Sequence, residues 1–285
     1  MSEKVEIFEV GPRDGLQNEK QHIPTADKIA LVDCLSAAGF RRIEIASFVS
    51  PKWVPQMADS ADVLAGITRV DGISYAALTP NMRGFEGAVA AKADEVAIFG
   101  SASEGFSRAN INATIAESLA RFGPVAEAAK TQGIAVRGYV SCVSDCPYDG
   151  PVEPAQVAKV AKALLDMGCY EISLGDTIGQ ASPERIDALL EAVSAVVPVE
   201  KLAGHYHDTS GRALDNIEAS LARGVRVFDA AVGGLGGCPY APGAAGNVAT
   251  EAVNTRLTAL GYDTGLDADI IEKAAEMARA MRQGA

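Results

Sequence analysis

Two of the three histidines in the chain, His205 and His207, stand two residues apart in the segment HYHD. Side chains alternate faces along a β-strand, so this spacing would point both imidazoles the same way, about 7 Å apart at the backbone. Neutral imidazole is a common metal ligand near neutral pH. We therefore expect one divalent cation between His205 and His207, in preference to a buried pair with a purely structural role.

Two oxygen-bearing residues could complete a metal site. Asp14 lies in the segment GPRDG, and Asn247 ends the glycine-rich segment GGLGGCPYAPGAAGN. Together with the two histidines they offer a carboxylate, an amide oxygen and two imidazole nitrogens, a mixed set that suits Mg²⁺ or Mn²⁺ better than zinc. Taken alone, Asp14 could form a turn beside Gly15, and Asn247 could cap a helix.

Four further residues are candidates for catalysis. Arg13, beside Asp14, can present a permanent positive charge to an oxygen anion formed next to the metal; a surface ion pair is the alternative. Glu44 and Asp176 lie in strand-end runs where an unpaired carboxylate would be costly, so we expect them to orient Arg13 and the ligands or to transfer protons. Cys238 lies in the glycine-rich segment, which could close over a substrate and use this thiol as a proton donor; a small residue fitting a turn is the alternative.

Eight short apolar runs, rich in valine and isoleucine, alternate with longer helical patterns. The runs are centred near residues 7, 45, 75, 97, 139, 174, 205 and 230, which is an average step of about 32 residues. This repeat predicts an α/β fold, a single (β/α)8 TIM barrel over residues 1–285, with an additional C-terminal helix near 267–283 that packs across the barrel. The candidate residues follow the runs, where such barrels carry their active sites. A doubly wound open sheet is the competing fold, but GPRDGLQ is not its dinucleotide-type glycine turn.

Net charge and cysteine content limit the kinds of binding partner and the cellular compartment that we expect. The formal net charge is −12 and no basic cluster exceeds the pair Arg41 and Arg42, which argues against a nucleic-acid surface. Five scattered cysteines indicate reduced thiols, and a zinc site at Cys142 and Cys146 would need a second close pair or a nearby histidine. The first residues run directly into a strand pattern and no apolar run has membrane length, so we expect a soluble cytoplasmic protein without a membrane partner.

Five segments closely resemble the 3-hydroxy-3-methylglutaryl-CoA lyase family. They are VGPRDGLQNE at 10–19, SFVSPKWVPQMAD at 47–59, RGYVSC at 137–142, GCYEISLGDTIG at 168–179 and GGLGGCPYAPGAAGN at 233–247. The resemblance covers nearly the whole chain and is to the bacterial form of the family. It implies a metal-dependent barrel enzyme that splits 3-hydroxy-3-methylglutaryl-CoA into acetyl-CoA and acetoacetate, which is chemistry of leucine degradation and ketone-body formation.

The resemblance also implies roles for individual residues. The matching metal ligands are Asp14, His205, His207 and Asn247, and the matching catalytic groups are Arg13, Cys238, Glu44 and Asp176. Arg13 would bind and polarise the substrate, and either Asp14 or His205 would be the base. The expected partner is a small-molecule acyl-CoA, with Arg108 and Asn110 as candidate contacts for its phosphate or pantetheine, and a homodimer is the candidate assembly. Tyr206 and Ser210 stand where many family members have Cys and Tyr, which concerns substrate preference.

Three other functions are considered. A related acyl-CoA lyase or a Claisen-type synthase acting on another 3-hydroxy acid is the nearest, but such synthases typically read RDGEQ where this chain reads RDGLQ, and they carry a regulatory domain. A metal-dependent hydrolase of amidohydrolase type puts its His-x-His motif on the first strand and needs more histidines. A non-catalytic metal-binding protein would not need Arg13, Glu44 and Cys238.

Overall fold

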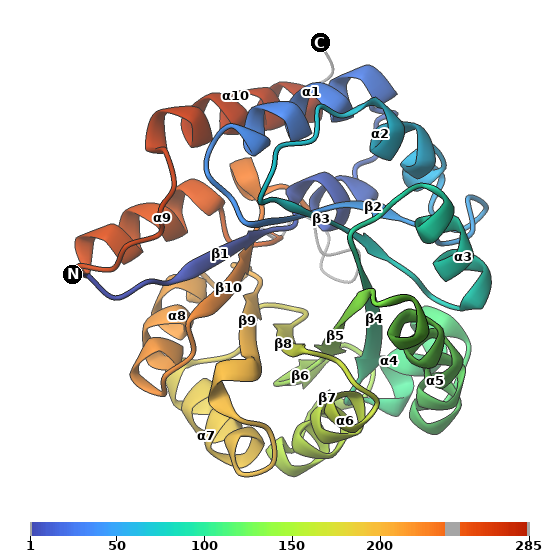
Figure 1. Cartoon of the computed structure of the whole chain (residues 1–285). Helices are drawn as coiled ribbons and strands as arrows, with labels where there is room; N and C mark the ends of the chain where they lie inside the picture. Colours follow the sequence, from blue (N-terminus) through green and yellow to red (C-terminus); the bar gives the residue numbers. More distant parts are fainter. Residues whose placement is uncertain (1, 237–245, 284–285) are drawn as a thin grey trace.

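Eight parallel strands close into a barrel in the computed structural model, which describes residues 2–236 and 246–283 (Figure 1). In chain order the barrel strands are β1 (Glu6–Glu9), β2 (Arg42–Ser47), β3 (Ser74–Leu78), β4 (Glu95–Ser101), β5 (Ala135–Ser141), β8 (Glu171–Asp176), β9 (Leu202–Tyr206) and β10 (Val227–Ala230). Each strand pairs with its chain neighbours in the barrel, and β1 closes the ring by pairing with both β2 and β10.

Helices surround the barrel (Figure 1). They are α1 (Thr25–Ser36), α2 (Ser60–Gly66), α3 (Met82–Ala90), α4 (Glu104–Ile111), α5 (Ile115–Gln132), α6 (Pro154–Asp166), α7 (Pro183–Ser194), α8 (Ala213–Ala222), α9 (Thr250–Ala259) and α10 (Ala268–Gln283). Short helical turns are η1 (Gly11–Gly15), η2 (Pro55–Met57), η3 (Val199–Lys201) and η4 (Val232–Gly234), and a small hairpin joins β6 (Asp145–Cys146) to β7 (Gly150–Pro151). Every apolar run singled out in the sequence forms a barrel strand, so the predicted (β/α)8 barrel with an extra C-terminal helix is confirmed.

The position predicted for the last helix is wrong. α10 does not pack across the barrel but lies alongside α1 in the outer ring, where it also contacts α9 and η4 (Figure 1). Its buried residues Ile271, Ala274, Ala275 and Ala278 recur at helical spacing and form one narrow stripe. Small side chains on this stripe let α10 pack closely against a neighbouring helix.

Side-chain alternation decides which residues reach the barrel interior. On β2, Ile43 and Ile45 are buried in the apolar core, while Glu44 between them bonds residues inside the barrel. On β5, Val136 and Val140 join the apolar core in the same way, and Arg137 contacts side chains across the barrel. The two-residue period of a strand therefore brings polar groups inward from runs that read as mainly apolar.

The interior of the barrel holds a buried ionic cluster. Arg137 is 1% exposed; its Nη2 lies 2.7 Å from Oδ1 of Asp229, and its Nε lies 2.7 Å from Oε1 of Glu171. Arg42 adds a second guanidinium on Glu171. Branched aliphatic residues usually fill this space in such barrels. The charges are tolerated here because each has a close partner of opposite sign.

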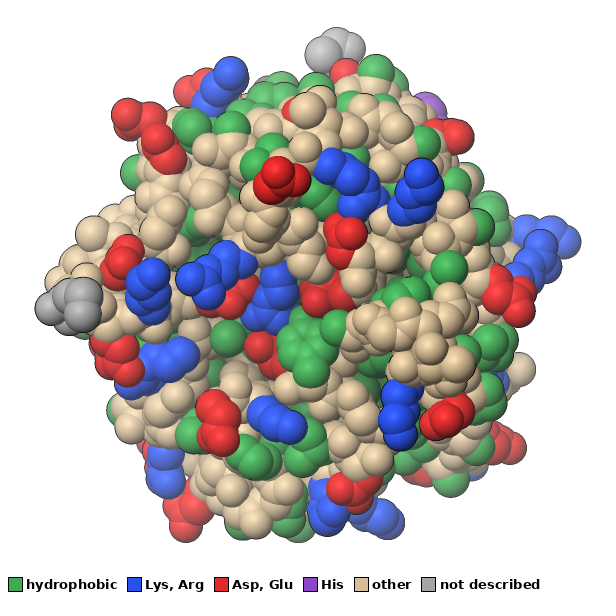
Figure 2. Space-filling view, viewed as in Figure 1, with side chains coloured by type: hydrophobic (Ala, Val, Ile, Leu, Met, Phe, Trp, Pro, Cys, Tyr) green, Lys and Arg blue, Asp and Glu red, His purple; other side chains and the backbone are tan. Residues whose placement is uncertain are grey.

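The visible surface in Figure 2 carries acidic and basic side chains in mixture, without one large basic patch on that face. Within residues 2–236 and 246–283, no helix combines the length and the apolar character needed to cross a membrane.

Candidate active site

Asp14, His205 and His207 converge at the carboxyl ends of the strands. Asp14 lies in η1, directly after β1; His205 lies in β9 and His207 directly follows it. Their candidate ligand atoms all lie within 4.8 Å of one another. The two imidazole rings are 5.4 Å apart between centroids, so the two-residue spacing does point both rings to one side. This arrangement brings together three of the four metal ligands expected from the sequence, and we call Asp14, His205 and His207 the metal group.

The electrostatics of these three groups fit a divalent cation. Burial alone would raise the pKa of Asp14, but the charge of Arg13, together with the neighbouring imidazoles and the hydrogen bond from Asn247, outweighs it and lowers the pKa to about 2, so this group is anionic. Burial and the neighbouring His205 lower the pKa of His207 to about 4, which leaves a neutral imidazole near neutral pH. His207 Nδ1 is buried and has no hydrogen-bond partner among the described residues. An unpaired nitrogen lone pair beside a carboxylate is what a metal ligand set requires.

Asn247, the fourth expected ligand, adjoins this group. Its Nδ2 donates to Oδ2 of Asp14 at 2.8 Å and to the carbonyl of Leu235 at 3.3 Å, and its backbone forms a bridge with His207. Coordination by Asn247 would use Oδ1 while Nδ2 stays on the Leu235 carbonyl. The structure places this residue at the site, and its role as a ligand stays a prediction.

Arg13 is held rigidly beside the metal group. Its Nε donates to Oε2 of Glu44 at 2.6 Å, its Nη2 contacts the same oxygen, and its Nη1 donates to Oδ1 of Asp14 at 2.6 Å. Tyr139 donates its hydroxyl to the same Glu44 oxygen at 3.1 Å, and its ring lies 5.5 Å from the guanidinium. Burial raises the pKa of Glu44 despite the opposing charge of Arg13. The contact between Glu44 and Arg13 is the one expected of a group that orients this arginine.

The other two residues expected to take part in catalysis are Asp176 and Cys238. Asp176 accepts hydrogen bonds from the backbone nitrogens of Gln180 and Ala181, at 3.3 and 2.9 Å, and so holds the loop after β8. Neither Arg13 nor a metal ligand is among these partners, so the geometry does not support the expectation that Asp176 orients Arg13. Its strand-end position gave no sign of this local loop contact. Cys238 lies outside the described residues.

Glu9 is a structural residue of the site that the sequence analysis missed. It is fully buried; its Oε1 accepts from the backbone nitrogens of Gly11 and Val232, at 2.7 and 3.0 Å, and its Oε2 accepts from the Thr250 hydroxyl at 2.6 Å. Burial raises the pKa of Glu9 to about 7. These bonds tie η1, which carries Arg13, to η4 and to the start of α9. An acidic residue in the first apolar run was the only available signal.

Asp229 and Arg137 were missed as well. Asp229 lies on β10, and its Oδ2 is 3.0 Å from Nδ1 of His205. Burial would lower the pKa of His205, but its hydrogen bond to Asp229 and the charges of Asp229 and Asp14 outweigh burial and raise it. An aspartate inside VFDAAVGG and an arginine inside VRGYVSC, both in apolar runs, were visible in the sequence, but nothing there paired them.

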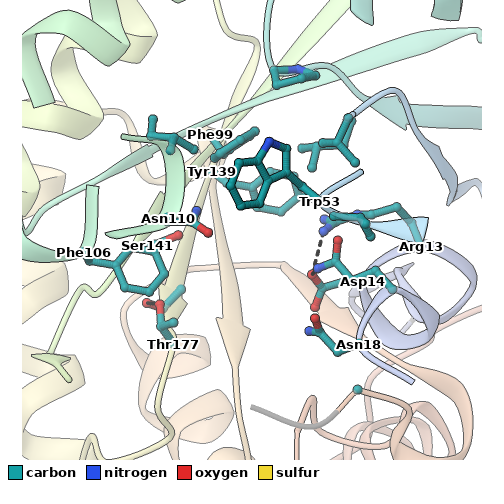
Figure 3. Close-up of a pocket in the computed structure, with 18 of the residues that line it drawn as sticks. Arg13, Asp14, Asn18, Trp53, Phe99, Phe106, Asn110, Tyr139, Ser141 and Thr177 are labelled. Atoms are coloured by element: carbon teal, nitrogen blue, oxygen red, sulfur yellow. Dashed lines mark hydrogen bonds and ion pairs between the residues drawn. The ribbon is translucent and has the colours of Figure 1, made fainter. Parts of the chain in front are cut away.

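A cavity of about 640 Å³ opens above the metal group. Figure 3 shows Arg13, Asp14 and Asn18 on one side of it and Phe106, Asn110, Ser141 and Thr177 on the other. Aromatic and aliphatic side chains form much of the remaining wall, including Trp53, Leu78, Phe99 and Tyr139. The cavity therefore joins a charged end at the metal group to a largely apolar wall, as expected for a small-molecule site.

Of the two residues considered for phosphate or pantetheine contacts, only one lines the cavity. Asn110 lines the cavity, but Arg108 is not among the residues that line it and lies 3.9 Å from Glu104 in an exposed helical pair. Arg121 of α5 lines the cavity instead. The sequence could not separate the two arginines, because their distance to the cavity depends on how α4 and α5 pack.

Comparison with known proteins agrees with this geometry. A family model described as HMGL-like matches residues 4–278. A lyase from Pseudomonas aeruginosa, named 3-hydroxy-3-isohexenylglutaryl-CoA/hydroxy-methylglutaryl-CoA lyase, is 60% identical over 267 residues, which are 94% of this chain and 89% of the relative.

Two solved structures extend the comparison. The HMG-CoA lyase from Brucella melitensis has a TM-score of 0.98 and 61% identity, and the match covers 99% of this chain and 100% of the other. An HMG-CoA lyase from Acinetobacter baumannii, solved in complex with coenzyme A and 3-methylmalate, has a TM-score of 0.93 and 38% identity, with 98% and 92% covered. Given these matches along nearly its whole length, the chain belongs to the HMGL-like family, together with the hydroxymethylglutaryl-CoA lyases that it resembles.

Proposed function

We propose that the protein is a divalent-metal-dependent carbon–carbon lyase that cleaves 3-hydroxy-3-methylglutaryl-CoA to acetyl-CoA and acetoacetate. The observation that carries this proposal is the contact between Arg13 and the metal group, where Nη1 of Arg13 lies 2.6 Å from Oδ1 of Asp14. A fixed guanidinium beside a cation site can stabilise an oxygen anion that develops next to the cation. A retro-Claisen cleavage forms such an anion when it releases a thioester enolate.

Asp14, His205, His207 and Asn247 are the residues that would hold the ion, and their oxygen and nitrogen atoms suit Mg²⁺ or Mn²⁺. When bound, the ion would lower the pKa of the tertiary hydroxyl of the substrate. It would also orient the substrate through this hydroxyl and the free carboxylate.

The residues of the chain would carry the proton transfers and the charge. Either Asp14 or His205 is the proposed acceptor of the hydroxyl proton. Asp14 can hold the ion through one oxygen and accept with the other, whereas His205 could accept only while its Nε2 is not bound to the ion. Cleavage of the carbon–carbon bond then releases acetoacetate and leaves the enolate, and Arg13 stabilises its oxygen. Glu44 and Tyr139 keep the guanidinium in place for this step. Cys238 is proposed to deliver the proton to the enolate carbon.

An acyl-CoA is the proposed small-molecule partner. The Acinetobacter relative was solved with coenzyme A, and here Asn110 and Arg121 line the cavity. Arg121 supplies a positive charge for a phosphate, and Asn110 can donate to or accept from the amides of pantetheine. A cytoplasmic location and a homodimeric assembly stay predictions.

A substrate with a longer branch at C3 is a second candidate. The apolar wall of the cavity includes Leu78 and Tyr139 of one buried hydrophobic cluster, and Phe99, which is partly buried and packs against that cluster. The Pseudomonas aeruginosa relative is named for both an isohexenyl and a methyl substrate. One methylene in an apolar pocket changes kcat/KM by about 10–200-fold, so two branches that differ by several carbons can be distinguished by kinetics on the same protein.

Purified protein incubated with 3-hydroxy-3-methylglutaryl-CoA, with and without Mg²⁺, tests the proposal. We expect acetoacetate and acetyl-CoA in equal amounts, and only with the metal. Absence of both products under either condition would reject the lyase function. Comparing kcat/KM for the methyl and isohexenyl substrates then decides between the two candidates.

A further inference from the structure

Inside the barrel, Asp229 on β10 links the ligand candidate His205 to the buried Arg137. The Asp229 carboxylate accepts from Arg137 through both oxygens, at 2.7 and 3.0 Å, and Oδ2 also accepts from the Ser173 hydroxyl at 2.7 Å. His205 Nδ1 lies 3.0 Å from the same Oδ2. The ion pair with Arg137 and the hydrogen bond from Ser173 therefore fix the position of this carboxylate independently of its contact with His205.

An ionised carboxylate can only accept hydrogen bonds, so the imidazole nitrogen facing it must carry a proton. For His205 this places the proton on Nδ1 and leaves the lone pair of the neutral ring on Nε2. That nitrogen faces the metal group, 3.9 Å from Oδ2 of Asp14. Fixing one ring nitrogen thus decides which atom is offered to a cation.

Arg137 keeps the carboxylate in this state. It is 1% exposed, and its guanidinium lies 4.3 Å from the centroid of the Phe8 ring and 4.9 Å from that of Tyr139. Because an arginine in a protein does not lose its proton, the pairing favours ionised Asp229. These two nearby rings restrict movement of the planar guanidinium.

We propose that Asp229, held by Arg137, is a positioning residue that fixes the Nδ1–H tautomer and the orientation of His205 at the metal group. The inference rests on the metal site of the proposed function but not on its substrate. Carboxylate partners of metal-binding histidines typically change metal affinity by about 10–100-fold when they are mutated. The same size of effect is expected here.

Two matched substitutions test this role, Asp229→Asn and Glu171→Gln. Each converts one of the two carboxylates on Arg137 into an amide, but of the two only Asp229 contacts His205. In the wild-type protein Arg137 and His205 together use both carboxylate oxygens of Asp229. An asparagine side chain has only one accepting oxygen, so in the variant either Arg137 or His205 loses an acceptor. Binding of Mn²⁺ to the purified full-length protein without substrate, followed by electron paramagnetic resonance, is the readout.

We expect Asp229→Asn to raise the Kd for Mn²⁺ by about 10–100-fold and Glu171→Gln to change it less than about twofold. Equal weakening in both variants would mean that Arg137 acts only through overall stability, and would overturn the proposal. An unchanged Kd in Asp229→Asn would overturn it as well. Failure of the wild-type protein to bind Mn²⁺ would remove the metal site itself, and with it the proposed function.

A measurement on the wild-type protein decides the question even if Asp229→Asn does not fold. The chain has three histidines, so long-range ¹H–¹⁵N spectra of histidine-labelled protein with Mg²⁺ are simple to assign. We expect His205 as the Nδ1–H tautomer, with a proton protected from exchange. An Nε2–H tautomer would overturn the proposal.

Discussion

Replacing Arg13 by glutamine tests the central electrostatic element of the site. Arg13 is 4% exposed and shares its three guanidinium nitrogens between Glu44 and Asp14. Glutamine is neutral and shorter and cannot span both carboxylates. The variant therefore removes the positive charge at the point where the enolate oxygen is proposed to develop, while the metal ligands stay in place.

The expected loss in turnover follows from the nature of the contact. Removing one preorganised donor to a developing oxyanion costs about 2.7–4 kcal/mol in the transition state, which corresponds to about 10²–10³ in kcat. The substitution also leaves Glu44 buried without its counter-charge. Because burial already raises the pKa of Glu44, this carboxyl can take up a proton instead of staying charged. We therefore expect the variant to fold, with a lowered Tm.

The assay pairs acetoacetate production at saturating Mg²⁺ with binding of Mn²⁺. Loss of a cation beside Asp14 removes a repulsion on a bound divalent ion, so the Kd for Mn²⁺ should stay the same or fall. Arg13→Lys is the matched control: it keeps the charge but not the planar fork, and should retain more activity than Arg13→Gln. A folded Arg13→Gln variant with turnover within about tenfold of wild type would refute the reasoning. A parallel loss of Mn²⁺ binding would refute it too, because the defect would then lie in the metal site.

Three further predictions concern the same groups. His207→Ala should weaken Mn²⁺ binding at least about tenfold in titrations of the purified protein, since even indirect partners of a metal contribute that much; unchanged metal content would contradict its role as a ligand. In the metal-free protein the pKa of His207 is about 4, against an ordinary value of 6.5. Between pH 4 and 6.5 the unfolded state therefore binds more protons at this residue than the folded state does. The contribution of His207 to stability falls as the pH drops from 6.5 to 4. The difference in unfolding free energy between wild type and His207→Ala should therefore shift by on the order of 3 kcal/mol over that range, and urea titrations that show a constant difference would speak against a buried neutral imidazole. Tyr139→Phe removes the 3.1 Å hydrogen bond to buried Glu44 and should lower the unfolding free energy by about 1–3 kcal/mol; an unaltered urea midpoint would show that this bond contributes nothing.

The sequence predicted the barrel because its signal is repeated and local. Each apolar run is long enough for one buried strand, and each intervening pattern is long enough for one helix, so the order of elements leaves few alternatives. It also predicted the convergence of Asp14 with His205 and His207. The carboxyl ends of parallel strands meet at one end of a barrel, so residues that follow different strands become neighbours whatever their separation in the chain.

Sequence patterns could not predict which charged residues pair with each other across the interior of the barrel. Arg137 and Asp229 are 92 residues apart, and no local rule distinguishes an inward charge that will be paired from one that would not be tolerated. Glu9 and Asp176 are similar cases, because each bonds backbone nitrogens whose positions follow only from the folded loops. The place of α10 likewise depended on which neighbour offered a matching surface.

The amino-acid sequence by itself determined the repeating order of strands and helices, the common direction of the His205 and His207 side chains, and the set of chemical groups available at the barrel mouth. These follow from backbone periodicity, which acts over a few residues. The tertiary structure decided that Asp229 holds His205, that Glu44 and Tyr139 hold Arg13, and that Arg121 rather than Arg108 lines the cavity. Those contacts depend on the register of neighbouring strands, which sets Asp229 of β10 opposite His205 of β9, on the closure of the barrel, and on how the helices pack around it. No single segment of the sequence contains this information.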